Sequence, residues 1–308
     1  MSRHNQQFLL AARPEGELKY SDFELVEAPM PEPGEGEFLV EARYVAVEPA
    51  MKGWMEGRVD YVAPMQIGEV MRGNVLGEVV ASNNGQFPEG SQVMGMLGWQ
   101  RYAACDGKSV PLQHVPDNIE PVAAMNVLGI TGLTAYFGML DIGKPEKGNT
   151  VLVSGAAGAT GSIAGQLARI EGARVVGIAG GPDKCEWLVS ELGFDAAIDY
   201  KSEDTAARVA ALCPEGIDVF FDNVGGDILD IALDKLAARA RVELSGGISR
   251  YTETGPVPGP LNYFPLELRR ARMEGFLGLD YANRFPEADE VLVKHLVSGE
   301  LRHRETVL

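Results

Sequence analysis

The sequence predicts an α/β protein with two domains, a small β-rich domain followed by a doubly wound parallel sheet covered by helices. Three observations lead to this prediction. The chain has 308 residues, and at about 150 residues per domain this length favours two domains. Residues 1–123 contain short strand-like segments separated by turns rich in Gly and Pro. From residue 124 to 295, apolar runs alternate with segments of helical period, which is typical of βαβ units.

The first domain is expected to be a small β-barrel. Its strand candidates are "GEFLVEARYVAVEP", "NVLGEVVAS" and "SQVMGML", and "PMPEPGEGE" is a turn-rich connector. In the second domain, near-continuous apolar runs predict strands that are buried on both faces. These runs are "TVLVSG", "RVVGIAG", "DAAIDY", "IDVFFDNVG", "RVELSGG" and "MEGFLGL". Helices are expected to begin near Thr160, Pro182, Ser202, Asp227 and Leu261.

Charge and cysteine content restrict the partners. The chain has 44 acidic and 27 basic residues, and its net charge of −17 disfavours binding to nucleic acid or to anionic membranes. Cys105, Cys185 and Cys213 are far apart and form no CxxC motif, so we expect reduced thiols rather than disulfides. The N-terminal run "FLLAA" is too short for a signal peptide. We therefore expect a cytoplasmic protein.

A glycine-rich turn follows the first strand of the second domain. Gly155, Gly158 and Gly161 lie between "VLVS" and a helix that opens with Thr160 and Ser162. Glycines there let backbone N–H groups approach a pyrophosphate, and the helix N-terminus adds partial positive charge. A plain tight turn is the alternative. The strand-turn-helix context favours nucleotide binding.

The next strand ends in "VVGIAGGPDK". An NAD-binding protein usually has an acidic residue at this point to bind the ribose hydroxyls, but this chain has Gly180 and Gly181. Lys184 falls in the first turn of the following helix, where a cation opposes the helix dipole unless a phosphate binds there. This pattern favours the 2′-phosphate of NADP. The alternative is a solvated Lys184 neutralised by Asp183.

Ordered motifs over nearly the whole chain resemble one known family. They are "PAMKGWM", "GEVMRG", "GWQRYA", "GLTAYFGMLDIG", "SGAAGATGS", "GIAGGPDKCEWL", "ELGFDAAIDYK", "GIDVFFDNVGG", "GGISRY" and "ARMEGF". The chain resembles the zinc-independent medium-chain dehydrogenases/reductases, in the branch of prostaglandin reductase, leukotriene B4 12-hydroxydehydrogenase and curcumin reductase. The resemblance implies a GroES-like catalytic domain, a Rossmann domain that binds NADPH, and a homodimer joined through the Rossmann domains.

The resemblance also implies roles for individual residues. Lys184 and Tyr200 would hold the 2′-phosphate, and Asn223 would lie at a ligand-binding strand end. Taken alone, Asn223 could be a turn-capping residue and Tyr200 an ordinary surface aromatic. The residues implied at the pyrophosphate are Ala157, Gly158, Ala159, Thr160 and Gly161. Those implied at the nicotinamide are Ser245, Gly246, Gly247, Ile248, Ser249, Tyr251, Phe276, Leu277 and Gly278.

A metal-free reaction is expected because the first domain offers no clustered zinc ligands. Cys105, His4 and His114 have no metal-binding spacing, and we expect the two histidines to be surface residues, with His114 in a loop. Without a Lewis acid, oxidation of an alcohol is disfavoured. Reduction of an activated C=C bond needs only a hydride donor and hydrogen-bond donors for the carbonyl oxygen of the substrate.

Tyrosine hydroxyls suit the role of hydrogen-bond donor. In segments that the family places at the active site, Tyr61 and Tyr251 are the candidates, although either could be a packing residue. Trp99 and Gln100 are expected near the substrate. Trp54, Met55 and Met65 are expected to form an apolar wall beside the substrate, and they could equally belong to the core.

The expected function is NADPH-dependent reduction of the C=C bond of α,β-unsaturated ketones and aldehydes. Alternatives are an NADP-dependent secondary alcohol dehydrogenase, a quinone reductase, and a non-catalytic NADP-binding protein. The chain ends at "LRHRETVL", where family members usually continue for roughly another 30 residues, so residues 296–308 are expected to begin a truncated return to the first domain.

Overall fold

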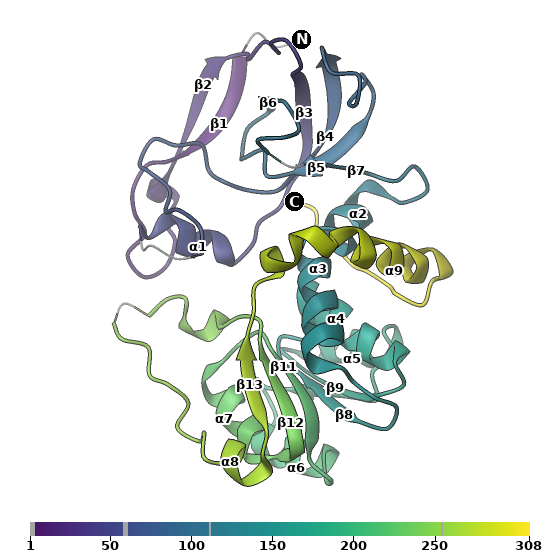
Figure 1. The fold of residues 1–308 in the computed structure, drawn as a ribbon. Helices are drawn as coiled ribbons and strands as arrows, with labels where there is room; N and C mark the ends of the chain where they lie inside the picture. Colours follow the sequence, from purple (N-terminus) through teal and green to yellow (C-terminus); the bar gives the residue numbers. More distant parts are fainter. Residues whose placement is uncertain (1–3, 58–60, 111, 254) are drawn as a thin grey trace. The chain divides into compact units, whose positions relative to one another are not determined.

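The computed structural model describes residues 4–57, 61–110, 112–253 and 255–308. The chain forms two compact units (Figure 1). The first unit is Met1–Met125 with Tyr251–Gly255, and the second unit is Asn126–Arg250 with Pro256–Leu308. The division between them falls at Met125, two residues beyond the predicted end of the first domain.

The first unit is built from antiparallel strands. Five of them form a sheet in the order β6-β3-β4-β5-β7, and β1 pairs with β2 in a separate two-stranded sheet. The elements are β1 His4–Leu10, η1 Tyr20–Asp22, β2 Phe23–Pro29, β3 Phe38–Val45, α1 Ala50–Met55, β4 Val75–Ser82, β5 Gln92–Gly95, β6 Tyr102–Cys105 and β7 Leu112–His114.

Two apolar clusters stabilise this unit. One lies on the five-stranded sheet and includes Phe38, Val75 and Val93. The other packs the short helix α1 against β1 and includes Leu10 and Met51. Because α1 contributes a large apolar surface to the second cluster, its position is fixed although it has only six residues.

The second unit contains a six-stranded parallel sheet. The strand order is β10-β9-β8-β11-β12-β13, which is the order of a Rossmann fold. Its elements are α2 Pro121–Val127, which begins in the first unit, α3 Ile130–Tyr136, η2 Phe137–Gly143, β8 Thr150–Val153, α4 Ala159–Ile170, β9 Arg174–Ala179, α5 Pro182–Ser190, β10 Ala196–Asp199, α6 Thr205–Leu212, β11 Ile217–Asp222, α7 Gly226–Asp234, β12 Leu236–Leu244, η3 Ile248–Arg250, α8 Pro265–Arg269, β13 Arg272–Gly275, η4 Gly278–Arg284 and α9 Phe285–Ser298.

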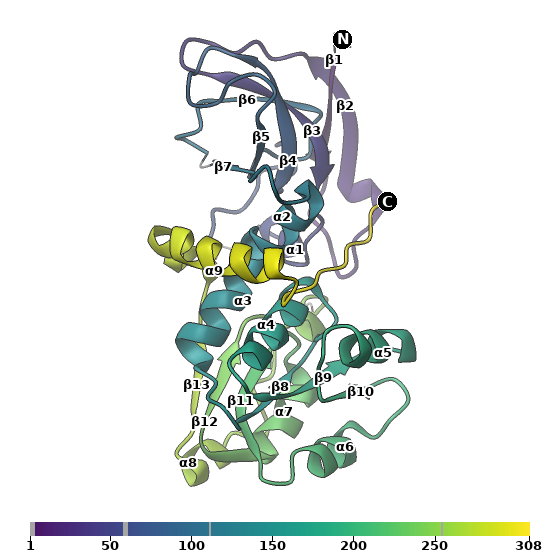
Figure 2. The ribbon, with the colours of Figure 1, turned by 90° about the vertical axis from the view of Figure 1, so that its right-hand side faces the viewer.

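Both faces of this sheet are buried, as the apolar runs predicted. Side chains that alternate along each strand point to opposite faces, so Phe220 packs with the cluster that contains Val209 of α6 and Leu233 of α7. The neighbouring Phe221 lies against Gly138 of η2 on the other face. Figure 2 shows the helices around the strands. The predicted fold class, α/β with an antiparallel domain and a doubly wound parallel sheet, is confirmed.

Several element boundaries differ from the predicted positions. Helix α6 begins at Thr205 rather than near Ser202, because the Asp204 side chain accepts a hydrogen bond from the Ala207 N–H and caps the helix there. Helix α8 begins at Pro265 rather than near Leu261, and β13 ends at Gly275, before the predicted strand end.

The C-terminal segment contacts helices α4 and α5 of the second unit. The Gln166 side chain donates a hydrogen bond to the Arg302 carbonyl and accepts one from the Arg302 N–H, at 2.9 and 2.7 Å. Leu301 is fully buried, and the Arg304 guanidinium lies 5.7 Å from the centre of the Trp187 ring. These contacts hold residues 301–304 against the second unit.

No single helix in the described part of the chain is long and apolar enough to cross a membrane. Two consecutive helical segments, Pro121–Val127 and Ile130–Gly143, are long and apolar enough only when they are counted together, and the chain bends by 43° between them.

Candidate cofactor and active site

The carboxyl ends of β8 to β12 lie at the same edge of the parallel sheet of the second unit. At β8 the strand order reverses, because β9 lies on one side of this strand and β11 on the other. Loops at such a reversal form the usual ligand-binding crevice of an open α/β sheet. The predicted cofactor residues of the second unit, apart from Phe276, Leu277 and Gly278, come from these loops or from the helices that follow them.

The turn between β8 and α4 depends on two glycines. Gly155 has a left-handed φ of 57°, and a Cβ on Gly161 would lie 2.5 Å from the Gly155 carbonyl oxygen. Both positions therefore require glycine. Helix α4 starts at Ala159, and its N-cap, Gly158, provides no side-chain cap. The first N–H groups of α4, including that of Thr160, thus have no acceptor within the helix and can bind an anion.

A buried carboxyl group organises the loop after β11. Asp222 accepts hydrogen bonds from the Ser154 hydroxyl at 2.6 Å and from the backbone N–H groups of Val224 and Gly225, both at 3.0 Å. Burial raises the pKa of Asp222, and these three hydrogen bonds oppose the rise. The Asn223 side chain donates to the Ser154 carbonyl at 2.7 Å. Asn223 is therefore tied to the end of β8, next to the glycine-rich turn.

The predicted nicotinamide segment after β12 is bound to this same loop. The N–H groups of Ser245 and Gly246 both donate to the Asp222 carbonyl, at 2.9 and 3.0 Å. The Ser249 hydroxyl donates to the Val224 carbonyl at 2.6 Å. The structure thus brings together the turn after β8, Asn223 and residues 245–249.

The segment "AGGPDK" turns sharply between β9 and α5. Gly181 has a φ of 101°, Pro182 is the first residue of α5, and Lys184 is exposed in the first turn. The Asp199 carboxylate, at the end of β10, accepts a hydrogen bond from the Gly181 N–H at 2.8 Å. This contact and the hydrogen bond from Ser202 lower the pKa of Asp199. Asp199 is therefore ionised at neutral pH and holds the turn.

Two side chains after β10 lie over Gly180. A Cβ at Gly180 would be 2.8 Å from Cε1 of Tyr200 and 2.9 Å from Cε of Lys201. A side chain at position 180 would require these two side chains to shift. The Tyr200 side chain is half exposed. An exposed turn that carries Lys184, Tyr200 and Lys201 fits an additional phosphate group.

Phe276, Leu277 and Gly278 follow β13 and pack on α3 and η2. The Phe276 ring makes an edge contact with Phe221, with 6.4 Å between ring centres, and lies close to Gly138. A Cβ at Gly278 would be 2.6 Å from the Thr134 hydroxyl. These contacts are structural, and a contact of this segment with the nicotinamide stays a prediction.

Helix α1 of the first unit contacts both candidate tyrosines. The Trp54 indole N–H donates to the Tyr61 hydroxyl at 3.1 Å, and the Lys52 ammonium donates to the Tyr251 carbonyl at 2.6 Å. Tyr61 is 42% exposed and Tyr251 is partly buried. The catalytic role of each tyrosine stays a prediction.

Other predicted residues of the first unit have structural partners. Trp99 stacks on Phe23 with 5.9 Å between ring centres. The Gln100 side chain accepts from Asn5 and Gln7 and donates to the Leu97 carbonyl at 2.8 Å. Members of the α1 core cluster are Trp54, Met55 and Met65. Packing explains all of these residues, and a contact of Trp99 or Gln100 with substrate stays a prediction.

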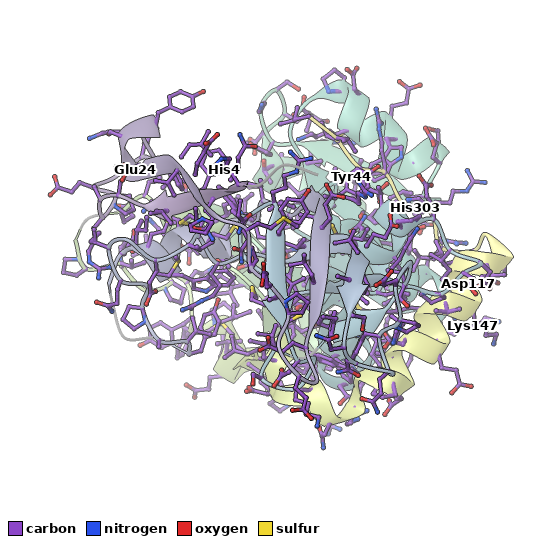
Figure 3. All side chains as sticks on the ribbon, turned by 90° about the horizontal axis from the view of Figure 1, so that it is seen from above. His4, Glu24, Tyr44, Asp117, Lys147 and His303 are labelled. Carbon is purple, nitrogen blue, oxygen red and sulfur yellow. The ribbon has the colours of Figure 1, made fainter. Side chains whose placement is uncertain are left out.

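Among the described residues, no group of three or more His, Cys, Asp or Glu side chains could hold a metal ion. His4 is exposed on β1 (Figure 3). His114 is the last residue of strand β7, not part of a loop as predicted, and its ring stacks on Phe87 with 4.8 Å between centres. Cys105, Cys185 and Cys213 are free thiols.

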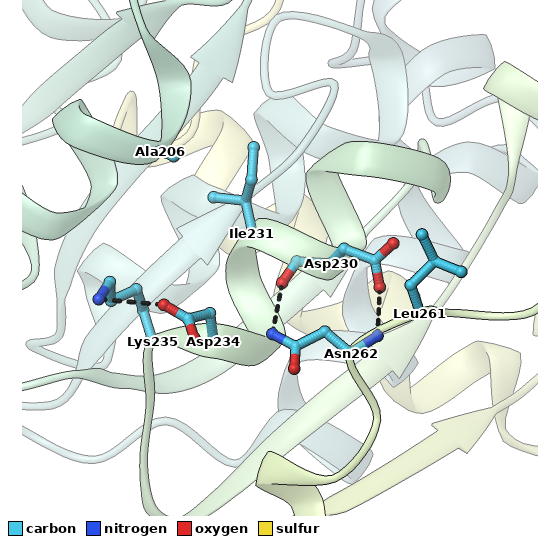
Figure 4. A pocket seen from close by; sticks show the side chains of 7 residues that line it. All are labelled: Ala206, Asp230, Ile231, Asp234, Lys235, Leu261 and Asn262. Atoms are coloured by element: carbon cyan, nitrogen blue, oxygen red, sulfur yellow. Dashed lines mark hydrogen bonds and ion pairs between the residues drawn. The ribbon is translucent and has the colours of Figure 1, made fainter.

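A depression of about 350 Å³ in the second unit lies away from the cofactor loops. Its lining includes Asp230 and Lys235 of the α7 region and Asn262, which donates to Asp230 through its backbone and its amide (Figure 4). Lys235 immediately precedes β12 and therefore lies at the amino edge of the sheet, opposite the edge that carries Asn223.

Comparison with known proteins places this geometry in a family. A model described as the N-terminal domain of oxidoreductase matches residues 6–112, and one described as zinc-binding dehydrogenase matches residues 159–294. The chain is 37% identical to the NADPH-dependent curcumin reductase of Escherichia coli over 99% of this chain and 90% of that protein. The chain belongs to the medium-chain dehydrogenase/reductase family.

Further relatives define the branch within this family. Bovine prostaglandin reductase 1 is 37% identical over 93% of this chain and 86% of its own length. The structure of CurA from Vibrio vulnificus in complex with NADPH superposes with a TM-score of 0.92, at 38% identity, and covers 98% of this chain and 91% of that chain. The chain is therefore a member of the prostaglandin reductase and curcumin reductase branch, as its motifs predicted.

The structure of this family member adds functional candidates that sequence reasoning missed. Asp222 precedes Asn223 in "FDNVGG", and Asp199 and Lys201 flank Tyr200 in "DYK". In the sequence, the only sign of these residues was their position beside predicted site residues. The hydrogen bonds in the structure are needed to distinguish a residue that holds a loop from one that could contact a ligand. Lys52 in "PAMKGWM" gave no signal, because its partner Tyr251 is 199 residues away.

Proposed function

We propose that this protein uses NADPH to reduce the C=C bond of α,β-unsaturated ketones and aldehydes. The observation that carries the proposal is the set of dinucleotide-binding loops joined through Asp222 and Ser154, in a chain whose near full-length relatives are NADPH-dependent reductases. We also propose that the reaction proceeds without a metal and takes place in the cytoplasm. The three free thiols support that location.

The residues of the second unit fit the dinucleotide. When bound, NADPH supplies the hydride. The first N–H groups of α4 would hold the pyrophosphate. Lys184 and Tyr200 would bind the 2′-phosphate, and Lys201 adds a second positive charge beside Gly180. Asn223 and residues 245–249 form one hydrogen-bonded surface that would orient the nicotinamide.

The tyrosines of the first unit would assist the substrate. As an enone is reduced, negative charge collects on its carbonyl oxygen, and a hydrogen-bond donor aimed at that oxygen lowers the barrier. The Tyr251 and Tyr61 hydroxyls are the proposed donors. The hydrogen bond that Tyr61 accepts from Trp54 polarises its own O–H group and makes it a stronger donor.

The test follows NADPH absorbance with an enone, a quinone and a saturated ketone in separate assays, and measures NADPH binding by fluorescence titration. We expect tight NADPH binding and rapid oxidation with the enone alone. Turnover mainly with the quinone or the ketone would indicate a quinone reductase or an alcohol dehydrogenase. Binding without turnover on any acceptor would indicate a non-catalytic NADP-binding protein.

We further propose a homodimer formed through the second unit. Strand β13 is the last strand of the parallel sheet, so one side of it lacks a partner strand within the described sheet. Exposed apolar side chains lie just before it on Tyr263, Phe264 and Leu268. An unprotected edge next to exposed apolar side chains supports pairing with a second copy.

A further inference from the structure

Lys52 is a buried lysine in the short helix α1. Only 8% of its surface is exposed, whereas lysines are almost never fully buried unless they are paired. Its ammonium group forms an ion pair with Glu56, four residues later, which supplies a compensating charge. A buried charge is costly to maintain unless its remaining hydrogen bonds are also satisfied.

The second partner of the Lys52 ammonium is the backbone carbonyl of Tyr251, at 2.6 Å. Tyr251 begins a short segment, Tyr251–Gly255, that belongs to the first unit although the chain on either side of it belongs to the second. A hydrogen bond from a charged donor is shorter and stronger than one between neutral groups. Lys52 therefore holds this segment where it joins the first unit.

The same helix turn also reaches the other candidate donor. Trp54, two residues after Lys52, donates to the Tyr61 hydroxyl. Trp54 is itself fixed in the α1 core cluster, so the helix has little freedom to shift. One rigid element thus sets the positions of the Tyr251 backbone and the Tyr61 hydroxyl.

We propose that Lys52, neutralised by Glu56, is a positioning residue that fixes Tyr251 for hydrogen bonding to the substrate carbonyl oxygen. This proposal rests on the proposed double-bond reductase function. The Lys52 ammonium does not touch the substrate in this scheme. It acts through the Tyr251 backbone, because a displacement of about 1 Å at a catalytic group can lower the rate by roughly 100-fold.

The test is a double-mutant cycle with Lys52→Met and Tyr251→Phe, in which kcat and KM for an enone are measured together with the NADPH dissociation constant. We expect each single variant to lower kcat by about 10- to 100-fold with NADPH affinity within about twofold. The double variant should be little worse than Tyr251→Phe, because residues that act as a unit are not additive. Lys52→Arg, which keeps a charged donor, should recover part of kcat.

Lys108→Met is the matched control, because Lys108 is an exposed lysine of the same unit, and its activity should equal that of the wild type. If thermal unfolding shows that Lys52→Met does not fold, Lys52→Gln takes its place in the cycle. That variant removes the charged donor and keeps a polar side chain at this position. Rate losses of Lys52→Met and Tyr251→Phe that multiply in the double variant would overturn the proposal.

A readout without turnover separates this proposal from the proposed function. Hydrogen–deuterium exchange of the peptide that spans residues 248–256 should increase in Lys52→Met and stay unchanged in Lys108→Met. Unchanged exchange in Lys52→Met would overturn the positioning role even in an active enzyme. If the wild type reduces no enone while exchange still increases in Lys52→Met, the proposed function fails and the anchoring of Tyr251 stands.

Discussion

Single charged side chains at the turn after β9 should decide cofactor preference. Lys184→Ala is expected to weaken NADPH binding by about tenfold or more, because a charge-assisted hydrogen bond contributes about 1.5–3 kcal/mol. NADH, which has no 2′-phosphate, should bind almost unchanged. Lys201→Ala should shift the preference in the same direction and by less, because its side chain packs over Gly180. Fluorescence titrations with both cofactors measure these effects.

The control for these two variants is Lys235→Ala, at the amino edge of the sheet and opposite the cofactor loops. It should leave both affinities unchanged. Equal losses for NADPH and NADH in Lys184→Ala would contradict a role at the 2′-phosphate and favour a solvated lysine.

The strand ends β8, β11 and β12 should behave as one hydrogen-bonded element centred on Asp222. Asp222→Asn is expected to lower the free energy of unfolding by about 1–3 kcal/mol, because an amide cannot accept all the hydrogen bonds that the carboxyl group accepts. NADPH affinity should fall as well, since Asn223 and residues 245–249 depend on this loop. Urea unfolding and NADPH titration test this prediction.

Asp227→Asn is a matched control, because Asp227 is an exposed residue in the first turn of α7 only five positions away. It should change neither stability nor NADPH affinity. A loss of stability without any loss of affinity in Asp222→Asn would show that the network does not shape the cofactor site.

A second buried carboxyl group lies between β12 and η2. Glu243 is fully buried, and among the described residues neither of its carboxyl oxygens has a hydrogen-bond partner. It fits only because Gly143 has no side chain, since a Cβ there would lie 2.2 Å from Glu243 Oε1. Burial raises the pKa of Glu243 well above its usual value, Arg241 and Arg272 oppose the rise, and Glu274 adds to it.

This carboxyl group should make stability depend on pH. The pKa of Glu243 is higher in the folded state than in the unfolded state. Its contribution to the stability of the folded state is therefore complete below the unfolded pKa of about 4.3 and is lost as pH rises toward the folded pKa. Glu243→Gln should therefore raise the melting temperature more at pH 8 than at pH 5. Calorimetry at the two pH values tests this, with the exposed Glu215→Gln as control. An equal change at both pH values would contradict a raised pKa.

Association of the whole molecule should depend on the apolar surface before β13. Phe264→Glu places a charge on an exposed apolar residue of this surface and is expected to convert a dimer to a monomer. Light scattering after size-exclusion chromatography measures the mass. Tyr20→Glu, at a fully exposed residue of the first unit, should leave the mass unchanged. A wild-type monomer would contradict the proposed dimer.

For the whole molecule, the fold class followed from the alternation of apolar runs and helical segments, and the structure confirmed it. The family also followed from ordered motifs, and comparison with known proteins confirmed it. Helix α5 begins at the predicted Pro182 because proline fits the first helical position. Helix α6 and strand β13 were less well predicted, since their ends depend on the Asp204 cap and on neighbouring strands.

The sequence by itself determined which strands are buried and where the glycine-rich turn lies, because these features depend on periodicity and on local backbone geometry. It also predicted, from Gly180 and Gly181, a preference for NADPH. Only the tertiary structure decided which polar groups work together. Asp222 joins three strand ends, and Lys52 contacts Tyr251 from 199 residues away. Hydrogen bonds form between residues that folding brings into contact, and their spacing along the chain leaves no pattern in the sequence.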